Sequence, residues 1–372
     1  MLVRRFSIAI LMVFILLSFL ITACRKDLPT DDISKSAVTG IPLLYCSVND
    51  QGSLNLYSLS WDIKKGSVVV GTNAIANLGT DELDSLNLHL IWDGNKTVLV
   101  SMAHPDNLAT GFNGYNVINL TTPPETFCQQ VVYKVPGSDT IMISYIEEPS
   151  QGNSNIVVET RDGNTASRKS INVPANIINI GGFLPIMIFG TPSNYTLLVA
   201  YDQQNLSSQE AIGKLLLATV QGDKVDWKEV YGSSCSFIAG AGAREVKTGN
   251  RVFINSGCNI AMVVDLDSQY IKLSDYKPIN DLYNSFPKDD NSDNPDNVSP
   301  RYRSYQGLLL VSFTNRDEER VWALKDDQCI GEIRLDKKQH KISAYKAGNI
   351  TESKELTGES IILPLDGCGT WQ

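Results

Sequence analysis

Short apolar runs alternate with turn-forming residues along most of the chain. From Ile41 onward, segments of four to six residues rich in Val, Ile, Leu and Tyr are separated by Gly, Asn, Asp and Pro. Such segments predict β-strands joined by turns. The only helical pattern, at Ser207–Leu217, is too short to organise a fold. Residues 41–372 are therefore expected to form an all-β domain.

The strands recur at a regular spacing. Each repeat begins with three apolar residues before a small or polar one, followed by a second apolar strand and a turn. A continuous apolar strand predicts burial on both faces, and a repeat of about 40–60 residues with several strands is typical of radially stacked sheets. The pattern predicts a β-propeller. The repeats begin 43 to 57 residues apart, at Leu43–Cys46, Val98–Ser101, Ile141–Ser144, Leu197–Ala200, Val252–Asn255 and Leu309–Ser312.

Two segments carry a resemblance to known propellers. The segment Leu59–Gly66, which contains Trp61-Asp62, is similar to the end of a WD-type blade. The segment Leu90–Lys96, followed by Val98–Ser101, resembles the opening of a blade in TolB-like propellers. The other repeats lack the Trp-Asp pair, so the resemblance concerns the architecture and implies no particular function.

The first repeat lacks an inner strand, and an apolar segment near the end of the chain is expected to supply one. No apolar strand precedes Leu43, whereas Ile361–Leu363 follows Leu309 by 52 residues with no partner of its own. Pairing of Ile361–Leu363 with Leu43–Cys46 would close the chain into six blades. Seven blades or a pair of β-sandwiches remain the alternatives.

The N-terminus carries an export pattern. Arg4 and Arg5 precede the apolar run Phe6–Ile21, which ends in Thr22-Ala23-Cys24. This ending resembles the lipobox of bacterial lipoproteins, which implies removal of residues 1–23 as a signal peptide and lipidation (palmitate) of Cys24. Polar residues 24–40 would form a flexible tether, and the domain would be extracytoplasmic, anchored to a bacterial cell membrane. An uncleaved membrane anchor or an ordinary secretory leader is the alternative.

The negative net charge of the chain argues against a nucleic acid partner. The chain has a formal net charge of −9 from 32 Lys+Arg and 41 Asp+Glu, and loss of the leader with its two arginines makes it −11. A phosphate backbone would be repelled, so no nucleic acid partner is expected. Anionic headgroups would be repelled too, which leaves the N-terminal lipid as the contact with the membrane.

Six cysteines remain after Cys24, an even number that suits an exported protein. A disulfide is predicted between Cys235 and Cys258. The segments after Cys235 and before Cys258 form a predicted hairpin that turns at Thr248–Asn250, so the two thiols would face each other near its open end. The pairing of the other cysteines stays open: Cys46, Cys128, Cys329 and Cys368.

The chain shows no established catalytic, cofactor or zinc motif. Its three histidines are isolated, and no CxxC pair, GxSxG, HExxH or phosphate-binding loop occurs. Asp289, Asn291 and Asp293 have the spacing of the first three ligands of a calcium loop, but Asn294 and Pro300 replace the Gly and Glu that such a loop requires. A solvated connector is predicted there, with a calcium site as the alternative.

The loop 283–306 is the predicted recognition element, because long loops on rigid scaffolds commonly carry binding residues. The expected function is a non-catalytic, membrane-tethered binding module for a protein, a glycan or another envelope component. The alternative is a hydrolase or lyase of polysaccharide whose carboxylates come from separate blades. The candidate recognition residues are Tyr283, Arg301, Tyr302, Arg303 and Tyr305.

Overall fold

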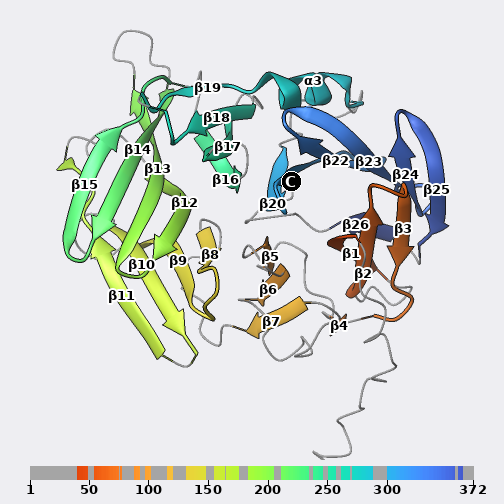
Figure 1. Ribbon diagram of the computed structural model, residues 1–372, viewed down its shortest axis with the longest axis horizontal. Coiled ribbons are helices and arrows are strands. Elements are labelled where there is room, and N and C mark those ends of the chain that lie inside the picture. The colour runs from red at the N-terminus through yellow and green to blue at the C-terminus, as the bar shows by residue number, and fades with distance from the viewer. Residues whose placement is uncertain are drawn as a thin grey trace, which may run out of the picture. The chain divides into compact units, whose positions relative to one another are not determined.

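The described residues form six β-sheets, called blades 1 to 6 in chain order (Figure 1). All described residues belong to one compact unit, Val38–Gln372. The computed structural model describes residues 40–48, 54–74, 76–77, 88–92, 97–101, 115–119, 131–147, 155–163, 165–175, 183–204, 211–233, 238–245, 250–256, 261–268, 270–287, 300–356 and 359–362.

Blades 1 to 3 come from the first half of the chain. Blade 1 contains β1 (Ile41–Val48), β2 (Leu54–Asp62), β3 (Ser67–Val70), β4 (Ala76–Asn77) and the C-terminal β26 (Glu359–Ile362). Blade 2 contains β5 (Leu88–Trp92), β6 (Thr97–Ser101) and β7 (Tyr115–Asn119), and β6 pairs with β7 in parallel. Blade 3 contains β8 (Val131–Lys134), β9 (Ile141–Glu147), β10 (Asn155–Asp162) and β11 (Thr165–Ile171).

Blades 4 to 6 complete the set. Blade 4 contains β12 (Phe183–Thr191), β13 (Asn194–Gln204), β14 (Ala211–Gln221) and β15 (Lys224–Glu229). Blade 5 contains β16 (Ile238–Glu245), β17 (Arg251–Ser256), β18 (Ala261–Asp265) and β19 (Leu273–Asp275), followed by helix α3 (Lys277–Ser285). Blade 6 has six strands: β20 (Arg301–Tyr305), β21 (Leu308–Thr314), β22 (Glu318–Lys325), β23 (Gln328–Asp336), β24 (Lys341–Lys346) and β25 (Asn349–Glu355).

Both faces of blade 4 are buried, as the continuous apolar strands predict. In blade 4, Leu197 and Val199 of β13 pack into a core shared with blade 3, whereas Leu198 and Ala200 pack into a core shared with blade 5. Alternate side chains of one strand thus serve two blade interfaces. Further cores join blade 5 to blade 6 and blade 6 to blade 1, and β5 of blade 2 lies beside β8 and β20. The all-β, six-bladed propeller expected from the repeat is confirmed.

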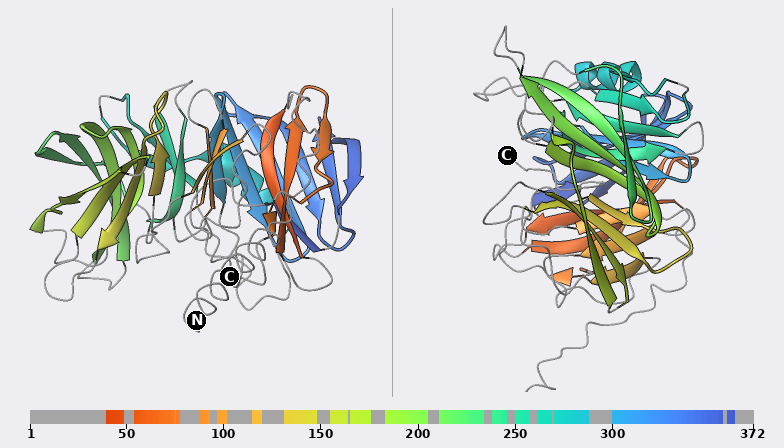
Figure 2. Two further views of the ribbon diagram at one scale, coloured as in Figure 1. Left: turned by 90° about the horizontal axis from the view of Figure 1, so that it is seen from below. Right: turned by 90° about the vertical axis from the view of Figure 1, so that its left-hand side faces the viewer.

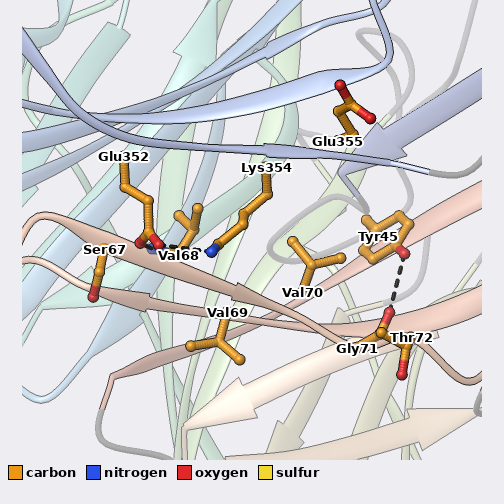
Figure 3. A pocket seen from close by; sticks show the side chains of 10 residues that line it. All are labelled: Tyr45, Ser67, Val68, Val69, Val70, Gly71, Thr72, Glu352, Lys354 and Glu355. Carbon is orange, nitrogen blue, oxygen red and sulfur yellow. Dashed lines mark hydrogen bonds and ion pairs between the residues drawn. The ribbon is translucent and has the colours of Figure 1, made fainter.

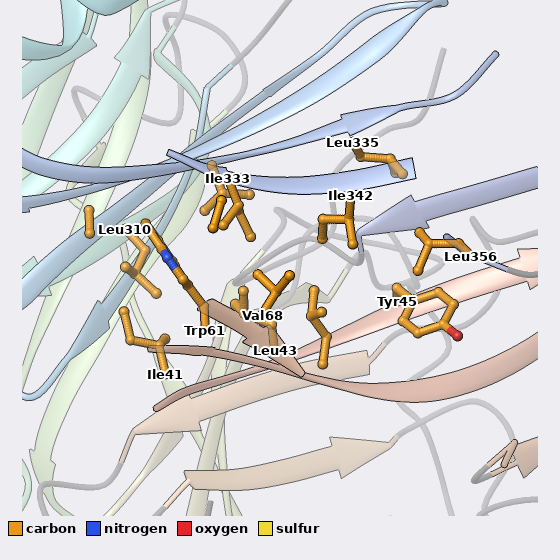
Figure 4. Packing of buried hydrophobic residues seen from close by; sticks show 14 of the residues in the cluster. Ile41, Leu43, Tyr45, Trp61, Val68, Leu310, Ile333, Leu335, Ile342 and Leu356 are labelled. Carbon is orange, nitrogen blue, oxygen red and sulfur yellow. The ribbon is translucent and has the colours of Figure 1, made fainter. Parts of the chain in front are cut away.

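The predicted closing strand is present. β26 pairs antiparallel with β1, with Tyr45 opposite Ile362 and Cys46 opposite Ile361. The C-terminal strand therefore supplies the inner strand that the first repeat lacks. Blade 6 packs on blade 1 through Trp61, Val68 and Leu43 on one side and Leu310, Ile333 and Ile342 on the other (Figure 4), and the strands of the two blades stand side by side in Figure 2.

The described α-helix and the weak helical pattern of the sequence lie in different segments of the chain. The segment Ser207–Leu217 does not form a helix where it is described, because Ala211–Gln221 is strand β14, paired along its length with β13. Helix α3 instead begins after Tyr276, with Pro278 in its first turn, where proline is favoured. Its Ile279 is buried in the core between blades 5 and 6. Tertiary burial on β13 outweighs the weak helical pattern of the earlier segment.

Candidate functional site

The predicted recognition residues fall on two elements. Tyr283 lies on α3 and packs against Phe313, with ring centroids 5.7 Å apart. Arg301, Tyr302, Arg303 and Tyr305 lie on β20, and the last three of them are buried. The structure thus places a helix and an inner strand at the two ends of the segment 283–306.

The contacts of β20 join blade 6 to its neighbours. The Tyr302 hydroxyl donates to the side-chain oxygen of Asn255 on blade 5, and burial raises the pKa of Tyr302 far above its ordinary value. Arg303 donates to the Pro42 carbonyl at 2.8 Å, and the Tyr305 hydroxyl donates to the Gly40 carbonyl at 3.4 Å. These contacts satisfy buried polar groups, as such groups require. Ligand recognition by these side chains stays a prediction.

Other predicted site residues lie outside the described residues: Cys24, Cys235, Cys258 and the calcium alternative Asp289, Asn291 and Asp293. Across the described strands and helix, no cluster of three or more His, Cys, Asp or Glu side chains has the geometry of a metal site. No described helix has the length and apolar character to span a membrane.

Two cysteines of unassigned pairing are described, and both are free thiols. Cys46 is buried in β1, and burial raises the pKa of its thiol to about 12. Cys329 is exposed at the start of β23, and its pKa is also raised by local burial of the thiol. A reactive cysteine requires a lowered pKa, so neither thiol has the environment of a nucleophile.

A cleft of about 500 Å³ lies where blade 6 covers the edge of blade 1 (Figure 3). One wall is β3, the edge strand of blade 1, and the opposite wall is β25, the last strand of blade 6. The volume lies within the range of about 300–1,000 Å³ found for small-molecule sites. The cleft is lined by Tyr45, Ser67, Val68, Val69, Val70, Gly71, Thr72, Glu352, Lys354 and Glu355.

One end of the cleft is closed by contacts between β25 and β3. The Glu352 carboxylate accepts a hydrogen bond from the Val68 backbone N–H at 2.9 Å. The Thr351 hydroxyl contacts the Gly66 carbonyl at 2.6 Å. Gly66 has a φ of +65°, and a Cβ there would lie 2.6 Å from Oγ1 of Thr351. Only glycine fits this turn, so the two strands approach closely at this end.

The floor of the cleft is apolar and rigid. Val68 is buried and Val70 is half-buried, and both are part of the core between blades 6 and 1. Tyr45 is buried and stacked on Tyr57, with ring centroids 4.8 Å apart and planes 9° from parallel. Its hydroxyl donates to the Gly71 carbonyl at 3.2 Å, and burial raises its pKa far above the ordinary value. A neutral phenol therefore holds the backbone of Gly71 in place.

The charged wall of the cleft is ordered by an ion pair. Lys354 Nζ lies 2.8 Å from Oε1 of Glu352. The hydrogen bond from Lys354, followed by that from the Val68 N–H, holds the pKa of Glu352 below its ordinary value. The wall thus presents one carboxylate and one ammonium group, which together carry no net formal charge, whereas the Glu355 carboxylate points away from β3 (Figure 3). The cleft combines an apolar floor with fixed donors and acceptors, which is the composition of a binding site for a small polar molecule.

No protein-family model matches the chain, and no curated protein matches its sequence. Among solved structures, the chain is similar to the lectin of Aleuria aurantia, in a mutant form bound to alpha-methyl-L-fucoside, at 12% identity and a TM-score of 0.34 over 89% of this chain and 98% of that one.

A second structure of the same lectin, described as a six-bladed β-propeller with a novel fucose recognition mode, gives 12% identity and a TM-score of 0.33 over 89% of this chain and 98% of that one. The WD40 domain of SCAP from fission yeast gives 10% identity and a TM-score of 0.28 over 90% of this chain and 68% of that one. The description of the cleft rests on the residues of this chain and not on these similarities.

Sequence reasoning missed the cleft. Val68 and Glu352 are 284 residues apart, and no local signal links them. The segment Asn349–Glu355 reads Asn-Ile-Thr-Glu-Ser-Lys-Glu, which is mostly polar and resembles a surface loop. The one usable signal was the strand-like alternation of Glu352 and Lys354, which places both side chains on one face of β25.

Proposed function

We propose that the protein is a non-catalytic carbohydrate-binding module whose ligand occupies the cleft between β3 and β25. The observation that carries the proposal is the ordered Glu352–Lys354 pair above the apolar floor of Val68 and Val70. A sugar ring presents C–H groups on one face and hydroxyl groups at its edge. The floor suits the former, and the Glu352 carboxylate and the Lys354 ammonium group of the wall suit the latter.

The charge and size of the cleft narrow the ligand further. The ammonium group of Lys354 is balanced by the Glu352 carboxylate, so the wall offers no net positive charge to attract a phosphorylated or acidic ligand. The cleft is lined by ten residues, fewer than the roughly 20–30 that each partner contributes to a stable protein interface. A neutral sugar or an amino sugar fits both limits, and a folded protein partner does not.

Glycan hydrolysis fits the cleft less well. A glycosidase needs one carboxylic acid kept protonated by a raised pKa beside a second, ionised carboxylate. The pKa of Glu352 is lowered, because Lys354 and the Val68 N–H both stabilise its charged form. Burial raises the pKa of Asp202, but this residue is on β13 of blade 4 and does not line the cleft. The cleft therefore offers recognition without an acid–base pair.

Attachment to the membrane forms the second part of the proposal. Lipidation of Cys24, which the lipobox-like Thr22-Ala23-Cys24 supports, would hold the propeller on an extracytoplasmic surface. A glycan-binding module in that position would meet envelope or environmental polysaccharide. The two parts are independent, since the cleft is formed by residues after Ile41.

The test is calorimetric titration of the full-length protein with glucose, galactose, mannose, fucose and N-acetylglucosamine, each with its methyl glycoside. We expect one of these sugars to bind. Lys354→Ala should weaken binding at least about tenfold, because it removes a charged hydrogen-bonding group. Lys277→Ala is the matched control, since it removes an exposed lysine paired with Asp281 on α3. Absence of binding by every sugar, or equal binding by Lys354→Ala and the wild type, would overturn the proposal.

A further inference from the structure

Two tyrosines form an exposed pair away from the cleft. The side chains of Tyr231 and Tyr270 are 60% and 67% exposed, although both are large and aromatic. Their ring centroids are 6.5 Å apart and their planes meet at 68°, which gives an edge-to-face corner. Aromatic side chains of folded proteins are mostly buried, so a solvent-facing pair in direct contact requires an explanation.

The buried neighbours of the two tyrosines in the chain direct both rings toward the solvent. Val230 and Ile271, the chain neighbours of the two tyrosines, are buried in the core between blades 4 and 5. Along extended backbone successive side chains point to opposite sides, so anchoring Val230 and Ile271 inward directs Tyr231 and Tyr270 outward. The rings are thus presented by the rigid interface of two blades.

Backbone hydrogen bonds hold the Tyr231 segment in register. The Tyr231 N–H donates to the Ile271 carbonyl at 3.0 Å, and the Leu273 N–H donates to the Tyr231 carbonyl at 2.7 Å. Gly232 follows with a φ of +101°, and a Cβ there would lie 2.7 Å from the Leu273 carbonyl oxygen. A glycine is required at this close approach. The tyrosine pair is therefore preorganised, which lowers the entropic cost of binding a ligand.

The surroundings of the pair select the ligand. Glu229, Lys272 and Ser274 are exposed polar residues next to it in the chain, so among the described residues here the exposed apolar surface is that of the two rings. A protein partner would need a larger apolar patch of several hundred Å². A pyranose ring matches a two-ring corner, because its C–H face packs on the electron-rich face of one phenol while its hydroxyls reach the polar neighbours.

We infer that Tyr231 and Tyr270 form a second carbohydrate-binding site, one that stacks a sugar unit of a neutral polysaccharide. The inference stands on the tyrosine pair and is independent of the cleft between β3 and β25. Two sites on one rigid domain would bind a polymer more tightly than either binds a single sugar, because the second contact becomes intramolecular. A polysaccharide with many identical units is the ligand that uses both.

The experiment is affinity gel electrophoresis of the full-length protein in gels that contain laminarin, xyloglucan, galactomannan or hydroxyethylcellulose. At least one polymer should retard the wild-type protein. Tyr231→Ala and Tyr270→Ala should each reduce the affinity by roughly tenfold, the upper range for loss of one aromatic contact. Tyr231→Phe and Tyr270→Phe keep the rings and should stay within about twofold of the wild type.

The controls separate this site from the cleft and from general hydrophobicity. Ile350→Ala removes an apolar side chain that is also 60% exposed, on β25, and should leave the retardation unchanged. Retardation that is lost in the alanine variants while no monosaccharide binds would support the tyrosine site and reject the cleft. The inference is overturned if no polymer retards the wild type, if the alanine variants migrate like the wild type, or if the phenylalanine variants lose as much as the alanine variants.

Discussion

The Glu352 carboxylate accepts a hydrogen bond from the backbone N–H of Val68, at 2.9 Å, across the boundary between the last blade and the first. β3 is the edge strand of blade 1, and an edge with free backbone groups invites pairing with another chain. The side chain of Glu352 accepts a hydrogen bond from one of these groups, the N–H of Val68. The same contact orders the wall of the cleft, so protection of the edge and formation of the site share one residue.

Replacing Glu352 by Gln should destabilise the protein by about 1 kcal/mol at neutral pH, because a charge-assisted bond at a partly exposed position is lost. The folded-state pKa of Glu352 is lowered, so its contribution is present above the unfolded pKa and is lost as the pH falls through the folded value. Urea unfolding at pH 7 and at pH 3 should show the difference between wild type and variant shrink at the lower pH. A difference of equal size at pH 3 would contradict the charge argument, and Glu355→Gln serves as the control.

Deletion of Glu359–Gln372 should lower the stability of the whole domain, because it removes β26 and exposes one edge of β1. Deletion of residues 363–372 alone keeps β26 and is the matched control. Thermal unfolding followed by circular dichroism would compare the two. An unchanged midpoint in the longer deletion would show that β26 contributes nothing to closure.

Gly331→Ala should destabilise the interface between blades 6 and 1. A Cβ at this position would lie 2.9 Å from Cζ2 of Trp61 and 3.1 Å from Cγ2 of Ile63. Trp61 is fully buried and has no room to move, so we expect a cost of about 1–3 kcal/mol. Chemical denaturation measures it, and Ile330→Ala at the neighbouring, partly exposed position should change the unfolding free energy by less. Equal stability of Gly331→Ala and wild type would mean that the interface relaxes freely.

Cys24→Ser should abolish lipid attachment. Metabolic labelling with a fatty acid should mark the wild-type protein and leave the variant unlabelled, and the variant should leave the membrane fraction. The basis is the apolar run Phe6–Ile21 ending at Thr22-Ala23-Cys24. Equal labelling of the two proteins would reject Cys24 as the acceptor.

A disulfide between Cys235 and Cys258 stays a prediction, with new support from the strand register. Ile238 of β16 lies opposite Ser256 of β17, and these residues are three and two positions from the two cysteines in the sequence. Closing this loop would add roughly 3 kcal/mol in the chain-entropy model. Peptide mapping of the unreduced protein should recover the two cysteines linked, and either one found free would reject the pairing.

The propeller could be predicted from the sequence because its apolar strands are short, local patterns that repeat along the chain. The apolar runs at Leu197–Ala200 and Leu309–Ser312 are buried from both sides, so their composition records their environment. The unpaired Ile361–Leu363 gave the closure for a similar reason, since an apolar strand without a neighbour must find one. Such features depend on a few adjacent residues.

The cleft and the contacts of β20 could not be predicted from the sequence, because they depend on side chains far apart in the chain. Arg303 is buried, and its guanidinium donates to the carbonyl of Pro42, 261 residues earlier, a contact that no local pattern predicts. Tyr231 and Tyr270 carry no motif, and their contact follows from the bridge between Tyr231 and Lys272. Composition shows that a residue is polar or aromatic, and only the fold shows what it faces.

The pairing of β1 has a mechanical consequence. β1 is bound along its whole length to β2 on one edge, and its last four residues are bound to β26 on the other. A force that pulls on the chain ahead of Gly40, along the axis of β1, would load these hydrogen bonds together in shear instead of opening them one at a time. The first strand after the N-terminal segment is therefore held on both edges against such tension.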